Sequence, residues 1–277
     1  MLRAMYSAVS GLRSHMSYMD VVGNNIANVN TIAYKSARAT FQDVLSQTIR
    51  NASAPVAGGL GGINPMQIGL GVNLAAVTNV MTQGAPQATG RVTDLAIQGT
   101  GFFVVSDGTG RLFYTRDGAF DLDAEGFLVN ASGYRVQGLD GSGTGIAGDI
   151  QIDLDDGSGN PLLAIAIDST GMITATYQGG ATIDFGPIAL ATFVNPGGLE
   201  RMGENLWGDT ANSGTPAYGQ PGTGGLGTIW TGTLEGSNVD LAYEFTNMIL
   251  AQRGFQANSR VITASDQILQ DLVNIIR

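Results

Sequence analysis

The chain has 277 residues, enough for one large domain or two ordinary ones, and a formal net charge of −10. This charge argues against nucleic-acid binding, because phosphate contacts require a surplus of lysine and arginine. The sequence has no cysteine, one histidine (His15) and one lysine (Lys35), so thiolate catalysis, disulfides and cysteine-ligated zinc are excluded, and little is left for histidine or Schiff-base chemistry.

The N-terminal segment, residues 1–35, predicts an amphipathic helix. Apolar residues recur at alternating spacings of three and four, which is the pattern of a coiled-coil stripe. The stripe consists of Leu2, Met5, Val9, Leu12, Met16, Met19 and Ile26. Gly23 takes the next stripe position and weakens the pattern there. We expect His15, beside the stripe, to flank a packed helix rather than to act in catalysis.

Four asparagines lie at the end of the stripe, within "NNIANVN", residues 24–30. Asparagine side chains bond to the local backbone and favour turns, so Asn24, Asn25, Asn28 and Asn30 are expected to end the helix. A catalytic loop and a joint between two packed elements both fit this composition. The residues alone therefore predict a break in the helix and leave its purpose open.

Residues 36–90 predict an extended connector. The stretch "NASAPVAGGLGGINPMQIGLG", residues 51–71, is rich in small residues and turn formers. Its candidate flexible positions are Gly58, Gly59, Gly61 and Gly62. Glycine places the fewest restrictions on the backbone, so bending of the connector is expected at these positions.

Residues 91–235 predict a β-rich domain, because the apolar period changes from about 3.6 residues to 2. The stretch 101–139 indicates four short strands separated by turns that contain glycine. A second series of strands is expected at 149–154, 161–169, 171–177, 181–186 and 188–194. Short strands without intervening helices predict an antiparallel sandwich or barrel. Residues 203–235 are expected to be a loop that returns the chain.

Residues 236–277 predict a long second helix, with Ser237, Asn238 or Asp240 as its cap. Apolar residues keep a seven-residue period, and the stripe consists of Leu241, Phe245, Met248, Phe255, Ile262, Leu269 and Ile276. Polar residues interrupt the companion row and would be costly if they were buried without partners. The stripe is therefore expected to be completed by neighbouring copies.

This order of elements predicts an α+β protein. The two terminal helices are expected to pair as a coiled-coil-like stalk, with a mainly antiparallel β domain between them. No window of the sequence reaches eighteen uncharged apolar residues, so no transmembrane segment is expected. The start of the chain lacks the apolar core of a cleaved signal peptide, which predicts either a cytoplasmic protein or export without a cleaved signal.

Two short motifs suggest ligand binding, but both lack the required context. "GTGIAG", residues 143–148, fits a dinucleotide-binding pattern, yet a strand pattern follows it where a helix should receive the phosphates. "DLDAEG", residues 121–126, opens like a calcium loop, but Ser132 takes the position of the bidentate glutamate. We expect its acids to surround a hairpin turn, with Phe120 and Leu122 facing inward. No catalytic residue, cofactor or metal ion is predicted.

Four stretches of the sequence resemble one protein family. "SGLRSHMSYMDVVGNNIANVNTIAYKSARATFQDVLSQTI", residues 10–49, is similar to the N-terminal signature of bacterial flagellar rod and hook proteins. "DLAIQGTGFFVV" and "FYTRDGAFDLDAEGFLVNASGYRVQG" resemble the β domain of that family, and residues 235–275 resemble its C-terminal helix. The stretches follow one another in the order expected for this family.

The resemblance implies a structural subunit of the flagellar axis that polymerises into a hollow helical tube. Its implied partners are further copies of the chain, neighbouring rod, hook-cap and hook–filament junction proteins, and the flagellar type III export apparatus. It implies a place in the extracellular hook or basal body. The apolar stripes would then form the assembly interface inside the tube, and the asparagine run would hold a joint between its layers.

Within the family, we expect a short hook protein, because the chain has little room for the outer domain that many hook proteins carry. A compliant connector at residues 50–71 would suit a hook that bends. The distal rod protein is the alternative, since the connector is long enough to resemble that protein's stiffening segment. A secreted β-rich adhesin with a helical stalk is the alternative from another class, and it would form closed oligomers.

Overall fold

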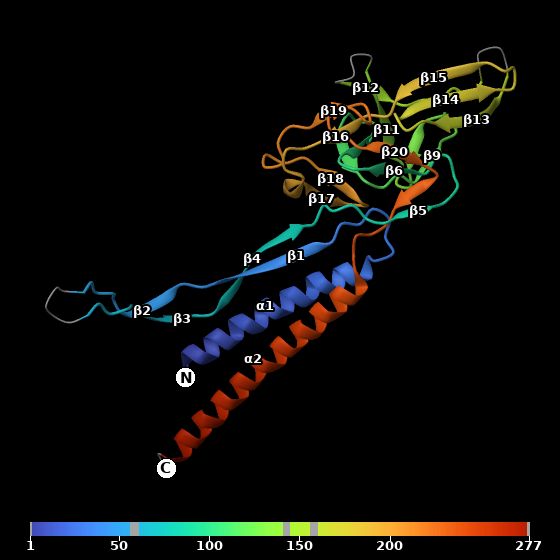
Figure 1. Cartoon of the computed structure of the whole chain (residues 1–277). Coiled ribbons are helices and arrows are strands. Elements are labelled where there is room, and N and C mark those ends of the chain that lie inside the picture. The colour runs from blue at the N-terminus through green and yellow to red at the C-terminus, as the bar shows by residue number, and fades with distance from the viewer. Residues whose placement is uncertain (1, 56–60, 141–144, 156–159, 276–277) are drawn as a thin grey trace. The chain divides into compact units, whose positions relative to one another are not determined.

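A computed structural model of the chain describes residues 2–55, 61–140, 145–155 and 160–275 (Figure 1). The chain divides into two compact units, each assembled from segments that lie far apart in the sequence. The first unit comprises Met1–Ala27, Ala37–Asn79 and Asp240–Arg277. The second unit comprises Asn28–Ser36 and Val80–Val239.

The first unit contains two long antiparallel helices, α1 (Leu2–Ala27) and α2 (Leu241–Ile275) (Figure 1). The cap of α2 is Asp240, whose Oδ1 accepts hydrogen bonds from the backbone amides of Ala242 at 2.9 Å and Tyr243 at 3.3 Å. This geometry satisfies amides that have no partner in the first turn of a helix, and it decides among the three predicted caps.

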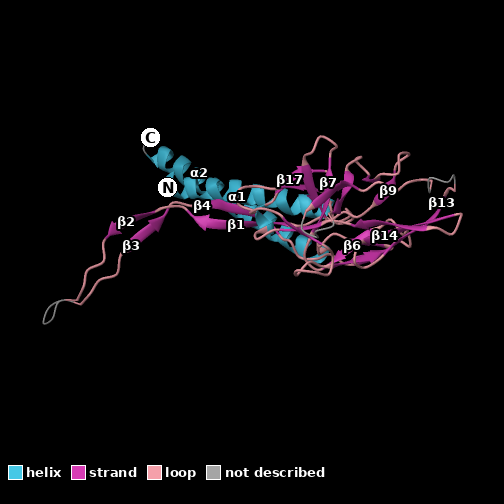
Figure 2. Ribbon diagram, turned by 90° about the horizontal axis from the view of Figure 1, so that it is seen from above, coloured by secondary structure: helices cyan, strands magenta, loops and turns pink. Residues whose placement is uncertain are grey.

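A long antiparallel ribbon completes the first unit (Figure 2). Strand β1 (Ala37–Asp43) pairs with β4 (Val72–Asn79), and β2 (Ser46–Arg50) pairs with β3 (Met66–Gly69). The ribbon contacts α1 where the backbone amide of Val72 donates to the Ser10 hydroxyl at 3.3 Å. Most of the segment that we expected to be an extended connector is thus a paired ribbon.

The second unit is built mainly from antiparallel strands. The strands of its ten-stranded sheet are β7 (Phe102–Ser106), β8 (Leu112–Thr115), β9 (Phe120–Leu122), β10 (Leu128–Asn130), β11 (Arg135–Leu139), β12 (Ile146–Asp149), β16 (Leu190–Thr192), β17 (Glu200–Gly203), β18 (Leu206–Gly208) and β19 (Ala217–Gly219). A three-stranded sheet consists of β13 (Leu162–Ile167), β14 (Met172–Tyr177) and β15 (Thr182–Pro187). A short 3-10 helix, Pro196–Gly198, precedes β17.

Two further strand pairs join early and late parts of the chain. Strand β5 (Pro86–Ala88) pairs with β21 (Thr233–Glu235), and β6 (Leu95–Gln98) pairs with β20 (Thr228–Thr231). These pairs bring the beginning and the end of the second unit together. They matter for the polar cluster described below, because Glu235 ends β21.

The core of the second unit lies on both faces of β7. All five residues of this strand are buried, and successive side chains point to opposite faces. Phe103 packs edge-on against Phe120 at 5.3 Å between ring centroids, in the larger apolar cluster. On the other face, Phe102 packs against Phe193 at 6.0 Å, in the cluster that contains Trp207. A continuous apolar run in the sequence therefore corresponds to a strand that is buried on both faces.

The structure confirms the predicted α+β class and the inward direction of Phe120 and Leu122, and it corrects two details. Residues 101–139 contain five strands where we predicted four. The predicted return loop at 203–235 contains β18 to β21, so that prediction was wrong. These strands are only three or four residues long, which is too short to show an apolar period. The "GTGIAG" motif lies partly outside the described residues and ends in β12.

Candidate assembly interface

The two helices meet through small and polar side chains. The buried residues of the two helices are Ala8, Gly11, Ser14, Val22 and Asn25 on α1 and Glu244, Ala251 and Ser265 on α2. A Cβ atom added to Gly11 would lie 2.5 Å from Nδ2 of Asn258, and one added to Gly254 would lie 2.5 Å from the His15 imidazole. The two glycines therefore allow a close approach of the helices, and the His15 ring packs against Gly254.

This geometry predicts opposite results for two glycine-to-alanine substitutions in the helices. A Cβ at Gly23 would meet no atom within 4 Å, so Gly23→Ala should stabilise α1 by about 0.5–1 kcal/mol through helix propensity. Gly254→Ala should give no such gain, because the His15 ring would have to move. Thermal unfolding followed by circular dichroism compares the two variants, and an equal gain for both would contradict the predicted packing.

The predicted apolar stripes are not the buried face of this helix pair. Side chains on the exposed side include Met16 at 53% exposure and Phe245 at 51%, together with Val9, Leu241 and Phe255. The half-buried stripe residues are Met5, Leu12, Met19, Ile26, Met248, Ile262 and Leu269. The side chain of Leu2 and all of Ile276 lie outside the described residues. The assembly role of the stripes stays a prediction, and their exposure leaves them accessible for contacts between copies.

The asparagine run begins inside the helix, since α1 continues to Ala27. Asn25 is buried, and it joins three elements of the first unit. Its Nδ2 donates to the carbonyl oxygen of Ala37 at 2.8 Å and to Oε1 of Glu244 at 3.0 Å, and its Oδ1 accepts from the amide of Ala37 at 2.9 Å. Asn25 thus holds the start of β1 and the first turn of α2 to α1.

The other asparagines of the predicted joint lie in different surroundings. Asn24 and Asn30 are exposed, and Asn28 is half-buried in the turn that follows α1. The hydroxyl of Thr31 donates to Oδ1 of Asn28 at 3.1 Å, which supports the predicted turn chemistry of this residue. The contacts of Asn25 with Ala37 and Glu244 are those of a joint within the first unit.

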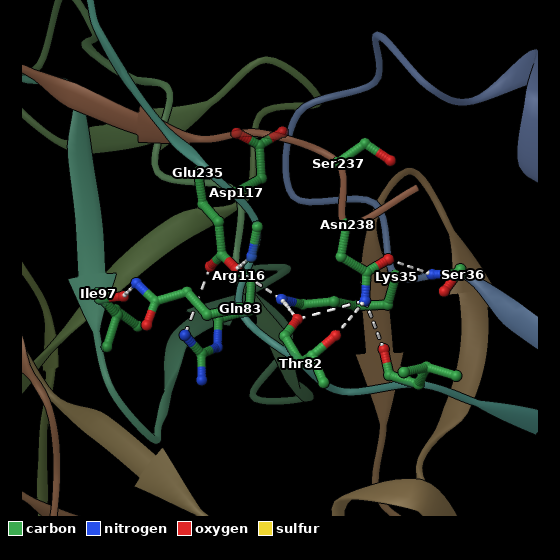
Figure 3. Close-up of polar contacts among 12 residues, drawn as sticks. Lys35, Ser36, Thr82, Gln83, Ile97, Arg116, Asp117, Glu235, Ser237 and Asn238 are labelled. Carbon is green, nitrogen blue, oxygen red and sulfur yellow. Dashed lines mark hydrogen bonds and ion pairs between the residues drawn. The ribbon is translucent and has the colours of Figure 1, made fainter. Parts of the chain in front are cut away.

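Residues 28–36, which we call the clasp segment, belong to the second unit. Lys35 lies in this segment and is 1% exposed. Its Nζ donates to Oε1 of Glu235 at 2.5 Å and to the carbonyl oxygen of Thr82 at 2.9 Å (Figure 3). The only lysine of the chain is therefore a buried structural cation, and the hydrogen bonds replace part of its lost hydration.

Glu235 is the centre of this polar cluster (Figure 3). Its Oε2 lies 3.4 Å from Nη1 of Arg116, and its Oε1 also accepts from the amide of Gly84 at 2.8 Å. The side chains of Arg116 and Glu235 are 6% and 1% exposed. Burial lowers the pKa of Lys35 and the pKa of Arg116, and the nearby Glu235 carboxylate opposes both shifts. The Glu235 carboxylate is thus the counter-ion of both buried cations.

Asn238 holds the other end of the clasp segment. Its Oδ1 accepts from the amide of Ser36 at 2.7 Å, and its Nδ2 donates to the carbonyl oxygen of Val80 at 2.8 Å (Figure 3). The role that we considered for this residue was a helix cap. The structure instead places it where residues 36, 80 and 238 meet in the second unit.

The β17–β18 hairpin contacts the clasp segment from another side. The guanidinium of Arg201 donates to the carbonyl oxygen of Lys35 and lies over the Tyr34 ring at 4.9 Å. Asn205 donates from Nδ2 to the carbonyl oxygen of Ile32 at 3.1 Å. Ala33 has a φ of 56°, a left-handed conformation that costs about 1–2 kcal/mol, and its amide donates to the carbonyl oxygen of Glu235 at 2.8 Å. The surrounding contacts hold this strained residue in place.

The arrangement is that of a structural contact. The cations and the carboxylate are paired with one another and with backbone groups. Within the described ranges, no group of three or more histidine, aspartate or glutamate side chains has the arrangement of a metal site. Neither helix, over its described residues, has a stretch that is long and apolar enough to cross a bilayer.

Three parts of the sequence match families of known proteins. Residues 5–35 match the family described as flagella basal body rod protein, and residues 231–275 match the C-terminal family of the flagellar basal body rod proteins FlgEFG. Residues 96–175 match the D1 domain of the flagellar hook proteins FlgE/F/G. The clasp segment and Glu235 thus lie almost wholly within the two terminal matches.

Whole-length relatives decide the family. The flagellar basal-body rod protein FlgG of Bacillus subtilis (strain 168) is 47% identical over 278 residues, which covers 100% of both chains. The chain belongs to the flagellar rod and hook family of axial proteins. FlgG of Borreliella burgdorferi is 35% identical over 280 residues and 100% of both chains. The hook protein FlgE of the same organism is 32% identical over an alignment of 442 residues, which covers 99% of this chain and all of the hook protein.

Proposed function

We propose that this chain is the distal rod subunit of the bacterial flagellum and that it polymerises into a stiff hollow tube. The observation that carries the proposal is the 47% identity to a FlgG rod protein over 100% of both chains. The alignments with hook proteins extend over 442 and 465 residues, so those proteins carry long segments without a counterpart in this chain. These comparisons favour our rod alternative over the hook function that we expected, and over an adhesin.

The β2–β3 ribbon supports a rod rather than a flexible hook. All residues of these strands are exposed, among them the apolar side chains of Ile49, Met66 and Ile68. A two-stranded ribbon is marginally stable alone, so contacts with neighbouring copies would fix it and stiffen the tube. Backbone hydrogen bonds between Ser53 and Ile63 extend the pairing towards Gly61 and Gly62. The other two connector glycines, Gly58 and Gly59, lie outside the described residues.

The exposed stripe residues of α1 and α2 provide the proposed contacts between copies. Met16 and Phe245 would be buried against neighbouring helices, and burial of a large apolar side chain contributes about 1.5–3 kcal/mol. A repeated heterologous contact of this kind gives an open helical assembly. We also propose that the chain is exported by the flagellar type III apparatus without a cleaved signal and contacts neighbouring rod and hook proteins in the basal body.

Replacement in living cells tests the rod assignment. The chain is produced in two Bacillus subtilis strains, one that lacks its FlgG rod protein and one that lacks its hook protein. We expect basal bodies with hooks and swimming motility to return in the rod-deficient strain alone. Rescue of the hook-deficient strain alone, or of neither strain, would contradict the proposal. The level of exported chain in each strain serves as the control for expression.

A further inference from the structure

The second unit is closed by segments from both of its ends. The late strands β20 and β21 pair with the early strands β6 and β5. The clasp segment contacts the same late region, since the amide of Asn238 donates to the carbonyl oxygen of Tyr34 at 3.3 Å. The core strands β7, β8 and β11 lie between these segments in the sequence. Neither the early half nor the late half of the unit can therefore form all of its strand pairs by itself.

Glu235 connects the closing segments chemically. It contacts Lys35 in the clasp segment, Gly84 before β5 and Arg116 after β8. The backbones also meet tightly, because a Cβ added to Gly84 would lie 1.9 Å from the carbonyl oxygen of Gly236. A chain with only one closing segment in place would leave a buried charge without its partner, which costs several kcal/mol.

We propose that this cluster is a completion lock: the second unit acquires stable structure only when residues 28–36 and 233–238 have closed around Glu235. The consequence for export rests on the proposed function. Whichever end of the chain leaves an export channel first, the second unit lacks a closing segment until most of the chain has emerged. The lock thus delays folding of the β strands that have emerged until both closing segments have left the channel.

Hydrogen exchange of the full-length chain at increasing urea concentrations tests the lock. The reporters are the backbone amides of Ala33 and Asn238 in the two closing segments and those of β7 and β8 in the core. A lock predicts that the amides of the closing segments and those of the core exchange through one shared unfolding event. Their exchange rates then have the same urea dependence. Exchange of the closing-segment amides at a lower urea concentration, while the amides of β7 and β8 stay protected, would overturn the proposal. This measurement needs no variant and no polymerisation, so its failure is distinct from failure of the rod assignment.

A substitution provides the second test. Glu235→Gln should accelerate exchange of the β7 and β8 amides by about 100-fold or more, since breaking a buried ion pair costs several kcal/mol. Asp121→Asn breaks an exposed ion pair with Arg91 in the same unit and should leave these rates unchanged. Faster exchange confined to residues 28–36 and 233–238 would overturn the lock. If Glu235→Gln yields no folded protein, the urea series on the unaltered chain decides.

Discussion

Glu235→Gln is expected to destabilise the second unit by about 3–5 kcal/mol. The amide keeps the shape of the side chain and an acceptor for Gly84, but it removes the negative charge from between Lys35 and Arg116. Both cations then remain buried without a counter-ion, while the unfolded chain hydrates them freely. Both tryptophans, Trp207 and Trp230, belong to this unit, so their fluorescence in a urea titration reports its unfolding.

Two variants control this experiment. Asp121→Asn removes a carboxylate whose side chain is 67% exposed and should change the stability by less than about 1 kcal/mol. Lys35→Met combined with Glu235→Gln should recover part of the loss, because one of the two unpaired cations is then absent. A Glu235→Gln variant as stable as Asp121→Asn would show that the cluster does not hold the unit together.

Asn25→Asp is expected to destabilise the first unit by about 3 kcal/mol or more at neutral pH. The aspartate cannot donate to Ala37 or to Glu244, and it places a second buried carboxylate where the Asn25 amide lay 3.0 Å from Oε1 of Glu244. Gln256→Glu adds the same charge at an exposed position of α2 in the same unit and is the control. Circular dichroism follows the helices during thermal unfolding.

The effect of Asn25→Asp should depend on pH in a defined direction. Two adjacent carboxylates raise the pKa of one of them above its value in the unfolded chain. The folded state then binds a proton more readily than the unfolded state, so the penalty is complete above the raised pKa and decreases as the pH falls through it. A penalty independent of pH, or one equal to that of Gln256→Glu, would contradict the contact with Glu244.

Periodicity in the sequence was sufficient to predict the two terminal helices and the β domain. Seven-residue spacing located α1 and α2, and Asp240 was among the predicted caps. The same reasoning did not find which helix face is buried within one chain. It selects the most apolar stripe, whereas the helices meet through small residues such as Gly11, Ala251 and Gly254, which carry little apolar signal.

The polar cluster could not be predicted from local patterns, because its members are far apart in the sequence. Lys35 and Glu235 are separated by 200 positions, and although each lies in a stretch that resembles the family, no local pattern links one to the other. One signal was available: Lys35 is the only lysine in the chain and lies five positions after Asn30, the last residue of the asparagine run. A lone lysine beside buried apolar residues such as Ala33 and Tyr34 is compatible with a structural cation, but its partner emerges only from the fold.

Electron microscopy of seeded assembly tests the proposed function most directly. The purified chain is concentrated, seeded with native hook–basal-body fragments and imaged in negative stain, with unseeded chain as the control. A stiff distal rod subunit should extend the seeds as straight tubes. Curved tubes that continue to grow would instead identify a hook subunit, and discrete closed particles that never elongate would contradict an axial role.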